Sequence, residues 1–169
     1  NVEIFDDDNE IVNFDVQGEI RIKGDNVFLE YWNKPQYTKD SFYNGWFKTG
    51  DIAIRNDRGV YKILGRSSVD IIKSGGYKIS AIEIEEILRE FPGIKECAVV
   101  GIEDKTWGEK IGAVVVLKSD NIFNINQLRE WAKDKIANYK LPTLLRVENS
   151  LPRNVMGKVD KIKVKELFK

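Results

Sequence analysis

Three short segments of the sequence combine glycine with a charged side chain, a combination that suits the binding of hydroxyl groups or anions. The first is Lys48-Thr49-Gly50-Asp51, in which a glycine permits a tight backbone and a carboxylate follows at the expected mouth of a strand. A carboxylate placed there can accept hydrogen bonds from two hydroxyl groups, as the recognition of a ribose requires. Because Gly-Asp is most often an ordinary turn, this segment alone is a weak indication.

The second segment runs from Gly65-Arg66 to Lys78. Its Gly75-Gly76 pair lets the backbone approach another group closely, and Lys73 and Lys78 place positive charge on both sides of that pair. The plain interpretation is a glycine-rich turn with solvated lysines, which we favour for this segment taken by itself. Its spacing fits neither a P-loop nor a dinucleotide-binding fingerprint.

The third segment lies near the end of the chain, where Lys158 directly follows Gly157 in an expected loop. A lysine in such a place is normally a surface charge. Its functional interpretation is a mobile cation that the loop delivers to a site. There an ammonium group can neutralise the charge that develops on a carboxylate or phosphate oxygen.

The composition excludes several kinds of site. The 169 residues contain no His, which rules out a His-based triad, a His metal cluster and a His proton shuttle within the chain. Cys97 is the only cysteine, so neither an internal disulfide nor a Cys-x-x-Cys zinc site can form, and we predict a buried small hydrophobe. No metal site is expected. Lys plus Arg equals Asp plus Glu, at 27 each, which disfavours a uniformly basic nucleic-acid-binding protein. No apolar run approaches the length of a membrane span.

The elements that must position these segments change in kind along the chain. The first part predicts strands over residues 2–5 and 19–23, a helix from Pro35 toward residues 44–45, and a hairpin of strands 51–55 and 60–64. Residues 1–64 carry 8 basic and 12 acidic side chains, whereas residues 65–169 carry 19 and 15. This imbalance fits either chance or a second part that meets an anionic ligand.

The second part predicts alternating helices and strands. A helix begins at the capping box Ser80–Glu83 and ends at Pro92-Gly93, and a second helix is capped by Asn124 and Gln127. Buried strands are expected over 96–101 and 113–117, with a short strand over 144–147. A final helix from about Asp160 should bury Ile162 and Leu167. Among the tryptophans, we expect Trp131 on a helix core face and Trp32, Trp46 and Trp107 as packing anchors.

In this order, the segments resemble the C-terminal part of the adenylate-forming (AMP-binding) enzymes. These are the acyl-CoA synthetases, the adenylation domains of peptide synthetases and the beetle luciferases. Within the family, residues 66–81 are most similar to malonyl-CoA synthetases. The resemblance runs essentially from end to end and rests on Gly18–Gly24, Lys48–Asp51, Gly65-Arg66 through Ile84-Glu85, and Pro152–Lys158.

The resemblance implies an α+β fold in two bodies. Residues 1–64 would be the last piece of a β-rich, barrel-like subdomain of a large N-terminal domain. Residues 65–70 would form a hinge, and residues 71–169 a small mobile α+β domain with a central sheet and flanking helices. The sequence begins at Asn1 in an expected strand without an initiator Met, so we expect a fragment or processed product of a longer protein.

The resemblance also implies a reaction. The family activates a small carboxylic acid with ATP and Mg²⁺, and in the synthetases CoA then attacks the acyl-adenylate. Implied roles are adenylation for Lys158, ATP or AMP binding for Asp51, Ile63 and Arg66, CoA binding for Lys73, Gly75, Gly76 and Lys78, and the hinge pivot for Ser68 or a neighbour up to Asp70.

Other features of the family are expected outside this chain. Its phosphate-binding loop and most of its acyl pocket lie upstream, so the fragment alone should be inactive without the missing N-terminal domain. We expect an intracellular protein of the cytoplasm or mitochondrion. Two alternatives stay open: an adenylation domain that loads a carrier protein, and a non-catalytic regulatory relative.

Overall fold

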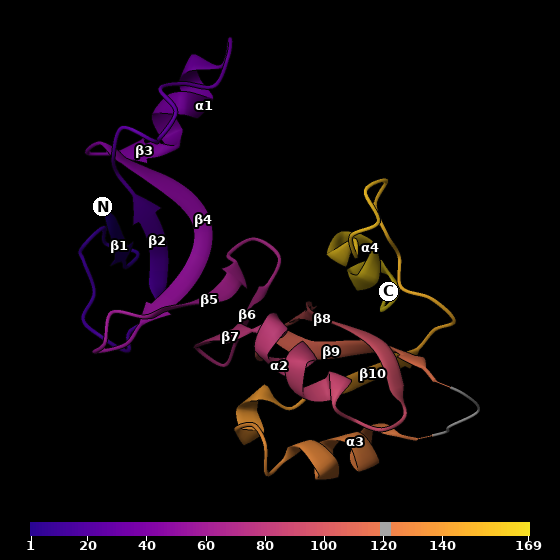
Figure 1. Cartoon of the computed structure of the whole chain (residues 1–169). Coiled ribbons are helices and arrows are strands. Elements are labelled where there is room, and N and C mark those ends of the chain that lie inside the picture. The colour runs from indigo at the N-terminus through magenta and orange to yellow at the C-terminus, as the bar shows by residue number, and fades with distance from the viewer. Residues whose placement is uncertain (119–122) are drawn as a thin grey trace. The chain divides into compact units, whose positions relative to one another are not determined.

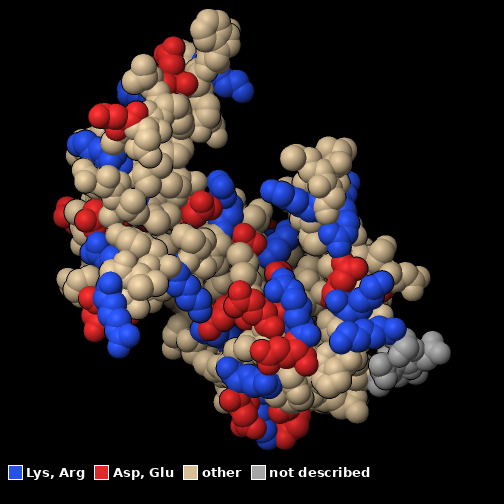
Figure 2. Space-filling model, in the orientation of Figure 1, with Lys and Arg blue, Asp and Glu red and all other residues tan. Residues whose placement is uncertain are grey.

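The computed structural model describes residues 1–118 and 123–169, and the chain divides into two compact units, Asn1–Ser68 and Val69–Lys169 (Figure 1). Each unit contains a five-stranded sheet. The expected α+β class is confirmed. Over the face that Figure 2 shows, acidic and basic side chains are interspersed, as the equal numbers of the two charges suggest.

The first unit is built around one long strand, which Figure 1 shows as strongly curved. This strand, β4, pairs with β2, β3 and β5, and β1 extends the sheet beyond β2; all pairings are antiparallel. A short helix precedes β3. The elements are β1 (Val2–Phe5), β2 (Gly18–Ile22), α1 (Pro35–Asp40), β3 (Phe42–Tyr43), β4 (Trp46–Arg55) and β5 (Tyr61–Arg66).

Two expectations for this unit were wrong in their boundaries. The helix ends at Asp40 rather than near residues 44–45, because Asn44 and Gly45 both adopt positive φ and form the tight turn between β3 and β4. Strand β4 begins at Trp46, so Asp51 lies inside it and not at its mouth. The strand passes through Gly50, whose φ is +75°, by means of an irregularity in its pairing with β2.

The second unit has a sheet in the order β10-β9-β6-β7, with β8 on the other edge of β9. Strand β10 runs parallel to β9, whereas β6, β7 and β8 pair in antiparallel fashion. Strands β8 and β9 form a long hairpin that extends beyond the expected 96–101 and 113–117. The elements are β6 (Ile71–Ser74), β7 (Tyr77–Ser80), α2 (Ala81–Arg89), β8 (Ile94–Asp104), β9 (Gly108–Leu117), α3 (Ile125–Ala132), the 3-10 turn η1 (Asn138–Lys140), β10 (Leu144–Val147) and α4 (Lys161–Glu166).

Both faces of this second sheet are buried along the middle of β8 and β9. Along β8, Cys97 and Val99 belong to a core that includes residues of α2 and α3, whereas Ala98 and Val100 belong to a smaller core with Val164 of α4. A strand buried on both faces reads as a continuous apolar run. This arrangement explains why β8 and β9 were recognisable as buried strands in the sequence.

The helix starts were predicted correctly. The Ser80 side chain accepts a hydrogen bond from the N–H of Glu83 at 3.1 Å, and Asn124 and Gln127 form a reciprocal capping box. The Asp160 side chain caps α4.

The core face of α4 was predicted incorrectly in part. Ile162 is 66% exposed, whereas Val164 is fully buried and Leu167 packs beside it. Positions 164 and 167 share one face of a helix because three residues separate them, and position 162 points roughly 200° away from 164. Trp32 is also not a packing anchor, since 87% of it is exposed.

Candidate functional site

Asp51 and Arg66 meet across neighbouring strands of the first unit. They are directly opposite in the pairing of β4 with β5, and Nε of Arg66 lies 2.9 Å from Oδ1 of Asp51. Arg66 also donates to the carbonyl of Thr49 at 3.2 Å. The Asp51 side chain is 33% exposed and that of Arg66 55%, so both remain within reach of a ligand. The pair therefore places carboxylate oxygens, which can accept hydrogen bonds from hydroxyl groups, beside a positive charge.

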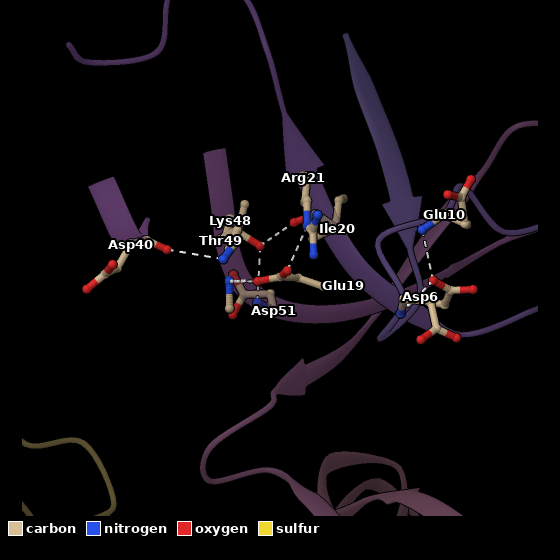
Figure 3. A network of polar contacts seen from close by, with 11 residues as sticks. Asp6, Glu10, Glu19, Ile20, Arg21, Asp40, Lys48, Thr49 and Asp51 are labelled. Atoms are coloured by element: carbon tan, nitrogen blue, oxygen red, sulfur yellow. Dashed lines mark hydrogen bonds and ion pairs between the residues drawn. The ribbon is translucent and has the colours of Figure 1, made fainter. Parts of the chain in front are cut away.

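An irregular stretch of β4 sets the position of Asp51 (Figure 3). Glu19 pairs with Ile52 and Arg21 with Lys48, so Thr49, Gly50 and Asp51 together oppose the single residue Ile20. The Thr49 hydroxyl donates to the Ile20 carbonyl at 2.6 Å and accepts from the Asp51 N–H. Bulges of this kind commonly redirect a side chain beside a functional site.

Glu19 holds the bulge from the neighbouring strand. Its Oε1 accepts from the Gly50 N–H at 3.1 Å, and its Oε2 pairs with Nε of Arg21 at 2.8 Å. Arg21 is almost fully buried and lies over the ring of Phe5. The orientation of Asp51 therefore depends on a network anchored in the sheet. Ile63, the third expected nucleotide contact, lies on β5 opposite Ala53 and is 52% exposed.

The residues expected to bind CoA lie on one hairpin of the second unit. Gly75 and Gly76 form the two-residue turn between β6 and β7, and both have positive φ. The Gly75 N–H donates to the carbonyl of Trp107, and a Cβ at Gly75 would lie 3.2 Å from the Trp107 ring. Only glycine lets the turn approach the indole this closely.

Two lysines face each other across the same hairpin. Lys73 and Lys78 are paired residues of β6 and β7, and both side chains are exposed. Like charges directly opposite on a sheet destabilise it. An anionic ligand at this hairpin would offset that cost.

A cavity of about 350 Å³ adjoins the turn. Its wall includes Gly75 and Trp107, the stacked rings of Tyr77 and Tyr139 with centroids 4.3 Å apart, and Arg129. Arg129 donates to the Pro142 carbonyl at 2.7 Å, which ties it to the backbone.

The loop that presents Trp107 to this cavity is fixed by Asp104. The Asp104 carboxylate accepts from the N–H groups of Thr106 and Trp107 and pairs with Lys110 at 2.5 Å. The ammonium of Lys110, followed by these two N–H groups, holds the pKa of Asp104 below its usual value. The indole is therefore held in place by a charged turn.

Lys158 lies in a small closed loop of the same unit. Oδ1 of Asn154 accepts from the N–H groups of Met156 and Lys158, each at 3.0 Å. The Asn154 N–H donates to the Lys158 carbonyl at 2.9 Å, and Gly157 takes a φ of +79° at the tip. The loop holds the backbone of Lys158 while its side chain stays exposed.

Arg153 fastens this loop to the sheet. Its guanidinium donates to the Gly157 carbonyl and forms an ion pair with Glu96 of β8. Glu96 lies near one end of the β8–β9 hairpin. The Gly75 turn lies at the other end, because Ser74 pairs with Gly108 and Gly108 pairs with Asp104. Eight residues of strand separate Glu96 from Asp104, roughly 26 Å along β8.

The structure thus places the expected site residues in three groups. Asp51 and Arg66 are in contact, with Ile63 on the same strand as Arg66. Lys73, Gly75, Gly76 and Lys78 share one hairpin, and Lys158 lies at the opposite end of that unit. Ser68 ends the first unit and Asp70 lies just inside the second, where it pairs with Lys161.

Several residues shape these sites in ways that the sequence interpretation did not assign to them. Asn154 and Gly157 carry the spacing of an Asx-type turn, which could have indicated the loop geometry. Glu96, Trp107 and Tyr139 gave no such signal, because their partners are distant in sequence. Within the described residues, no cluster of three or more His, Cys, Asp or Glu side chains is suited to holding a metal ion.

Comparison with known proteins identifies the family. Residues 83–158 match the model of the AMP-binding enzyme C-terminal domain. These residues of the chain therefore carry a C-terminal domain of the AMP-binding enzymes. The chain's similarity to them extends over both units, since the structure of ATP-bound MatB from Rhodopseudomonas palustris superimposes with a TM-score of 0.89 at 33% identity, covering 100% of this chain and 34% of that one.

Two further family members show the extent of the match. The mitochondrial malonate–CoA ligase ACSF3 of Homo sapiens is 49% identical over 146 residues, which is 86% of this chain and 25% of that protein. The o-succinylbenzoate CoA synthetase of Bacillus subtilis, in complex with an acyl-adenylate intermediate, has a TM-score of 0.88 at 35% identity, covering 98% of this chain and 33% of that one. The chain spans about a quarter of the length of the curated relatives it matches. No helix in the described part of the chain is long and apolar enough to cross a lipid bilayer.

Proposed function

We propose that this chain is the C-terminal part of an acid–CoA ligase that forms an acyl-adenylate from ATP and then an acyl-CoA thioester. The proposed substrate is malonate or another short to medium carboxylate, supported by 49% identity to a malonate–CoA ligase. Catalysis would require an N-terminal domain of the same protein, because the family resemblance places the phosphate-binding loop and most of the acyl pocket upstream of these residues. We propose a mitochondrial or cytoplasmic location, supported by the mitochondrial name of that relative.

The observation that carries this proposal is the separation of two loops on one compact unit. The Lys158 loop and the Gly75-Gly76 turn lie at opposite ends of the β8–β9 hairpin. One end offers an exposed ammonium, and the other a glycine turn beside an aromatic cavity. A unit that serves two steps at one active site must present these ends in turn. Pivoting within residues 65–70, at the boundary near Ser68, would allow this.

Each loop suits one step. In adenylation, negative charge builds up on the carboxylate and α-phosphate oxygens, and the ammonium of Lys158 would stabilise it without forming a covalent bond. Asp51 would accept hydrogen bonds from the ribose hydroxyls while Arg66 holds its carboxylate. In thioester formation, Gly75 and Gly76 would let the pantetheine arm pass close to the backbone, and Lys73 and Lys78 would attract the phosphates of CoA.

The family resemblance also implies Mg²⁺. The described residues lack a cluster of acidic side chains that fits this cation, so we assign none of them to holding it.

The proposal is tested with the full-length protein, by measuring the two half-reactions separately. Pyrophosphate release across a panel of carboxylates that includes malonate reports adenylation, and CoA consumption with supplied acyl-adenylate reports thioester formation. Lys158→Ala should slow adenylation by roughly 10²–10³-fold and largely spare thioester formation. Lys163→Ala, which removes an exposed lysine from α4, is the matched control.

The outcomes separate the alternatives. Equal losses in both half-reactions would contradict the role of Lys158. Reaction with a phosphopantetheinyl carrier but not with free CoA would indicate an adenylation domain. Absence of pyrophosphate release with every carboxylate would indicate a non-catalytic relative.

A further inference from the structure

A buried ion cluster joins three distant segments of the second unit. Nζ of Lys161 lies 2.7 Å from Oδ1 of Asp70 and 2.8 Å from Oε1 of Glu85. The three side chains are only 13%, 15% and 8% exposed. Glu85 is further fixed, because its Oε1 accepts from the Val99 N–H of β8 at 2.8 Å. The Lys161 ammonium is held by ion pairs and not by aligned hydrogen bonds within the described residues.

The cluster connects the proposed pivot to the catalytic loop. Asp70 is the second residue of the unit, and its carbonyl accepts from the Ala81 N–H at the start of α2 at 2.7 Å. Lys161 follows Lys158 by three residues and opens α4. The Asp160 N–H, between them, donates to the Pro152 carbonyl and closes the Lys158 loop. A continuous set of contacts therefore runs from Asp70 through Lys161 to the base of that loop.

Stability alone does not account for such a cluster. Buried ion pairs are costly to desolvate, and apolar side chains of similar size often serve a core as well or better. Charged groups do fix relative positions more specifically than apolar contacts, since both the distance and the direction of each partner matter. A cluster of charged side chains therefore suits the connection between the proposed pivot and the Lys158 loop, where a movement of one has to move the other.

We propose that the Asp70–Lys161–Glu85 cluster is a clamp that makes Asp70 move with the second unit. The same clamp keeps Lys158 at a fixed position relative to the pivot. This inference rests on the proposed function for its catalytic consequence. It restricts the pivot to residues 67–69 and excludes Asp70. It also assigns Lys161 as a positioning residue that acts through Lys158.

Backbone mobility tests the clamp without any assay of activity. In the 169-residue chain, ¹⁵N relaxation should give order parameters below about 0.6 at residues 67–69 and about 0.85 from Asp70 onward. Asp70→Asn removes one partner but leaves the Lys161–Glu85 pair intact, so the fold should persist. In this variant, the low order parameters should extend to residue 70 and appear at Lys158. The matched control is Glu90→Gln, which breaks the exposed pair between Glu90 and Lys135, and it should leave both regions unchanged.

The second measurement uses the half-reactions of the full-length protein. Asp70→Asn and Lys161→Met should lower kcat for adenylation by roughly ten- to a hundredfold, with KM for ATP little changed, because Lys158 is displaced while the nucleotide contacts are kept. Thioester formation from supplied acyl-adenylate should fall much less. Lys161→Arg keeps the charge and should recover most of the adenylation rate.

Each result decides the proposal. Low order parameters at Asp70 in the unmodified chain, or no change in the Asp70→Asn variant, would overturn the clamp. Equal slowing of both half-reactions would show that the cluster only stabilises the fold, and this result would also contradict the clamp. If the unmodified full-length protein releases no pyrophosphate, the proposed function fails, and the relaxation measurement still decides the clamp.

Discussion

The N–H of Lys158 donates to the side chain of Asn154, four residues earlier, at 3.0 Å. This hydrogen bond fixes the backbone of the lysine while its side chain stays exposed to solvent. Asn154→Ala should remove two acceptor contacts and loosen the loop, lowering adenylation about tenfold because a small displacement of a charged group reduces its effect on the transition state. Pyrophosphate release by the full-length protein measures this. Asn154→Asp keeps the acceptor oxygen and should retain most of the rate; an equal loss in both variants would count against the argument.

Asp51 should act on nucleotide affinity. Asp51→Asn removes a charged acceptor and leaves Arg66 without its partner carboxylate, so KM for ATP should rise about tenfold, in line with the energy of a hydrogen bond to a charged group. Because Arg66 is more than half exposed, the loss of the pair should have little effect on unfolding. The control is Asp57→Asn in the exposed turn before β5. An unchanged KM would show that Asp51 does not contact ATP.

The two glycines of the β6–β7 turn should differ in their tolerance of a side chain. Both have positive φ, so alanine at either position costs about 1–2 kcal/mol of stability. At Gly75 the new Cβ also meets the Trp107 ring at 3.2 Å, whereas at Gly76 it enters open space. Gly75→Ala should therefore lower the melting temperature more than Gly76→Ala and impair thioester formation more. Equal melting temperatures would contradict the close approach of the indole.

Cys97 should be inert. Burial, reinforced by the charge of Glu85, raises the pKa of its thiol to about 12, and the thiol contacts the Glu85 carbonyl at 3.5 Å. The thiol of the unfolded chain ionises near pH 8.5 (about the reference value), whereas the folded thiol stays protonated up to about pH 12. The free energy of unfolding is therefore unaffected by this group below about pH 8.5 and decreases as the pH rises from there toward about 12. An aromatic disulfide reagent at pH 8 should label the unfolded chain quickly and the folded chain on the order of a thousandfold more slowly. Rapid labelling of the folded chain would contradict this.

Local rules predicted some elements well. The caps at Ser80, Asn124 and Asp160 follow from side chains that bond to nearby N–H groups, so a short stretch of sequence contains the whole interaction. The exposure of Ile162 was missed because a six-residue helix gives too few turns to define its buried face. The contact between Asp51 and Arg66 depends on how β4 bulges against β2, and no pattern in the fourteen residues between them predicts that pairing. The resemblance supplied both residues, and the structure shows them in contact.

The length of the β8–β9 hairpin has a consequence for the order of the two proposed half-reactions. Its two ends lie roughly 26 Å apart along β8, so in the proposed function turning the ammonium toward the nucleotide would take the glycine turn away from it. Thiol attack would thus wait until the acyl-adenylate exists and the lysine has withdrawn. In the proposed function, this separation would order the two half-reactions in time and would protect the acyl-adenylate from premature transfer.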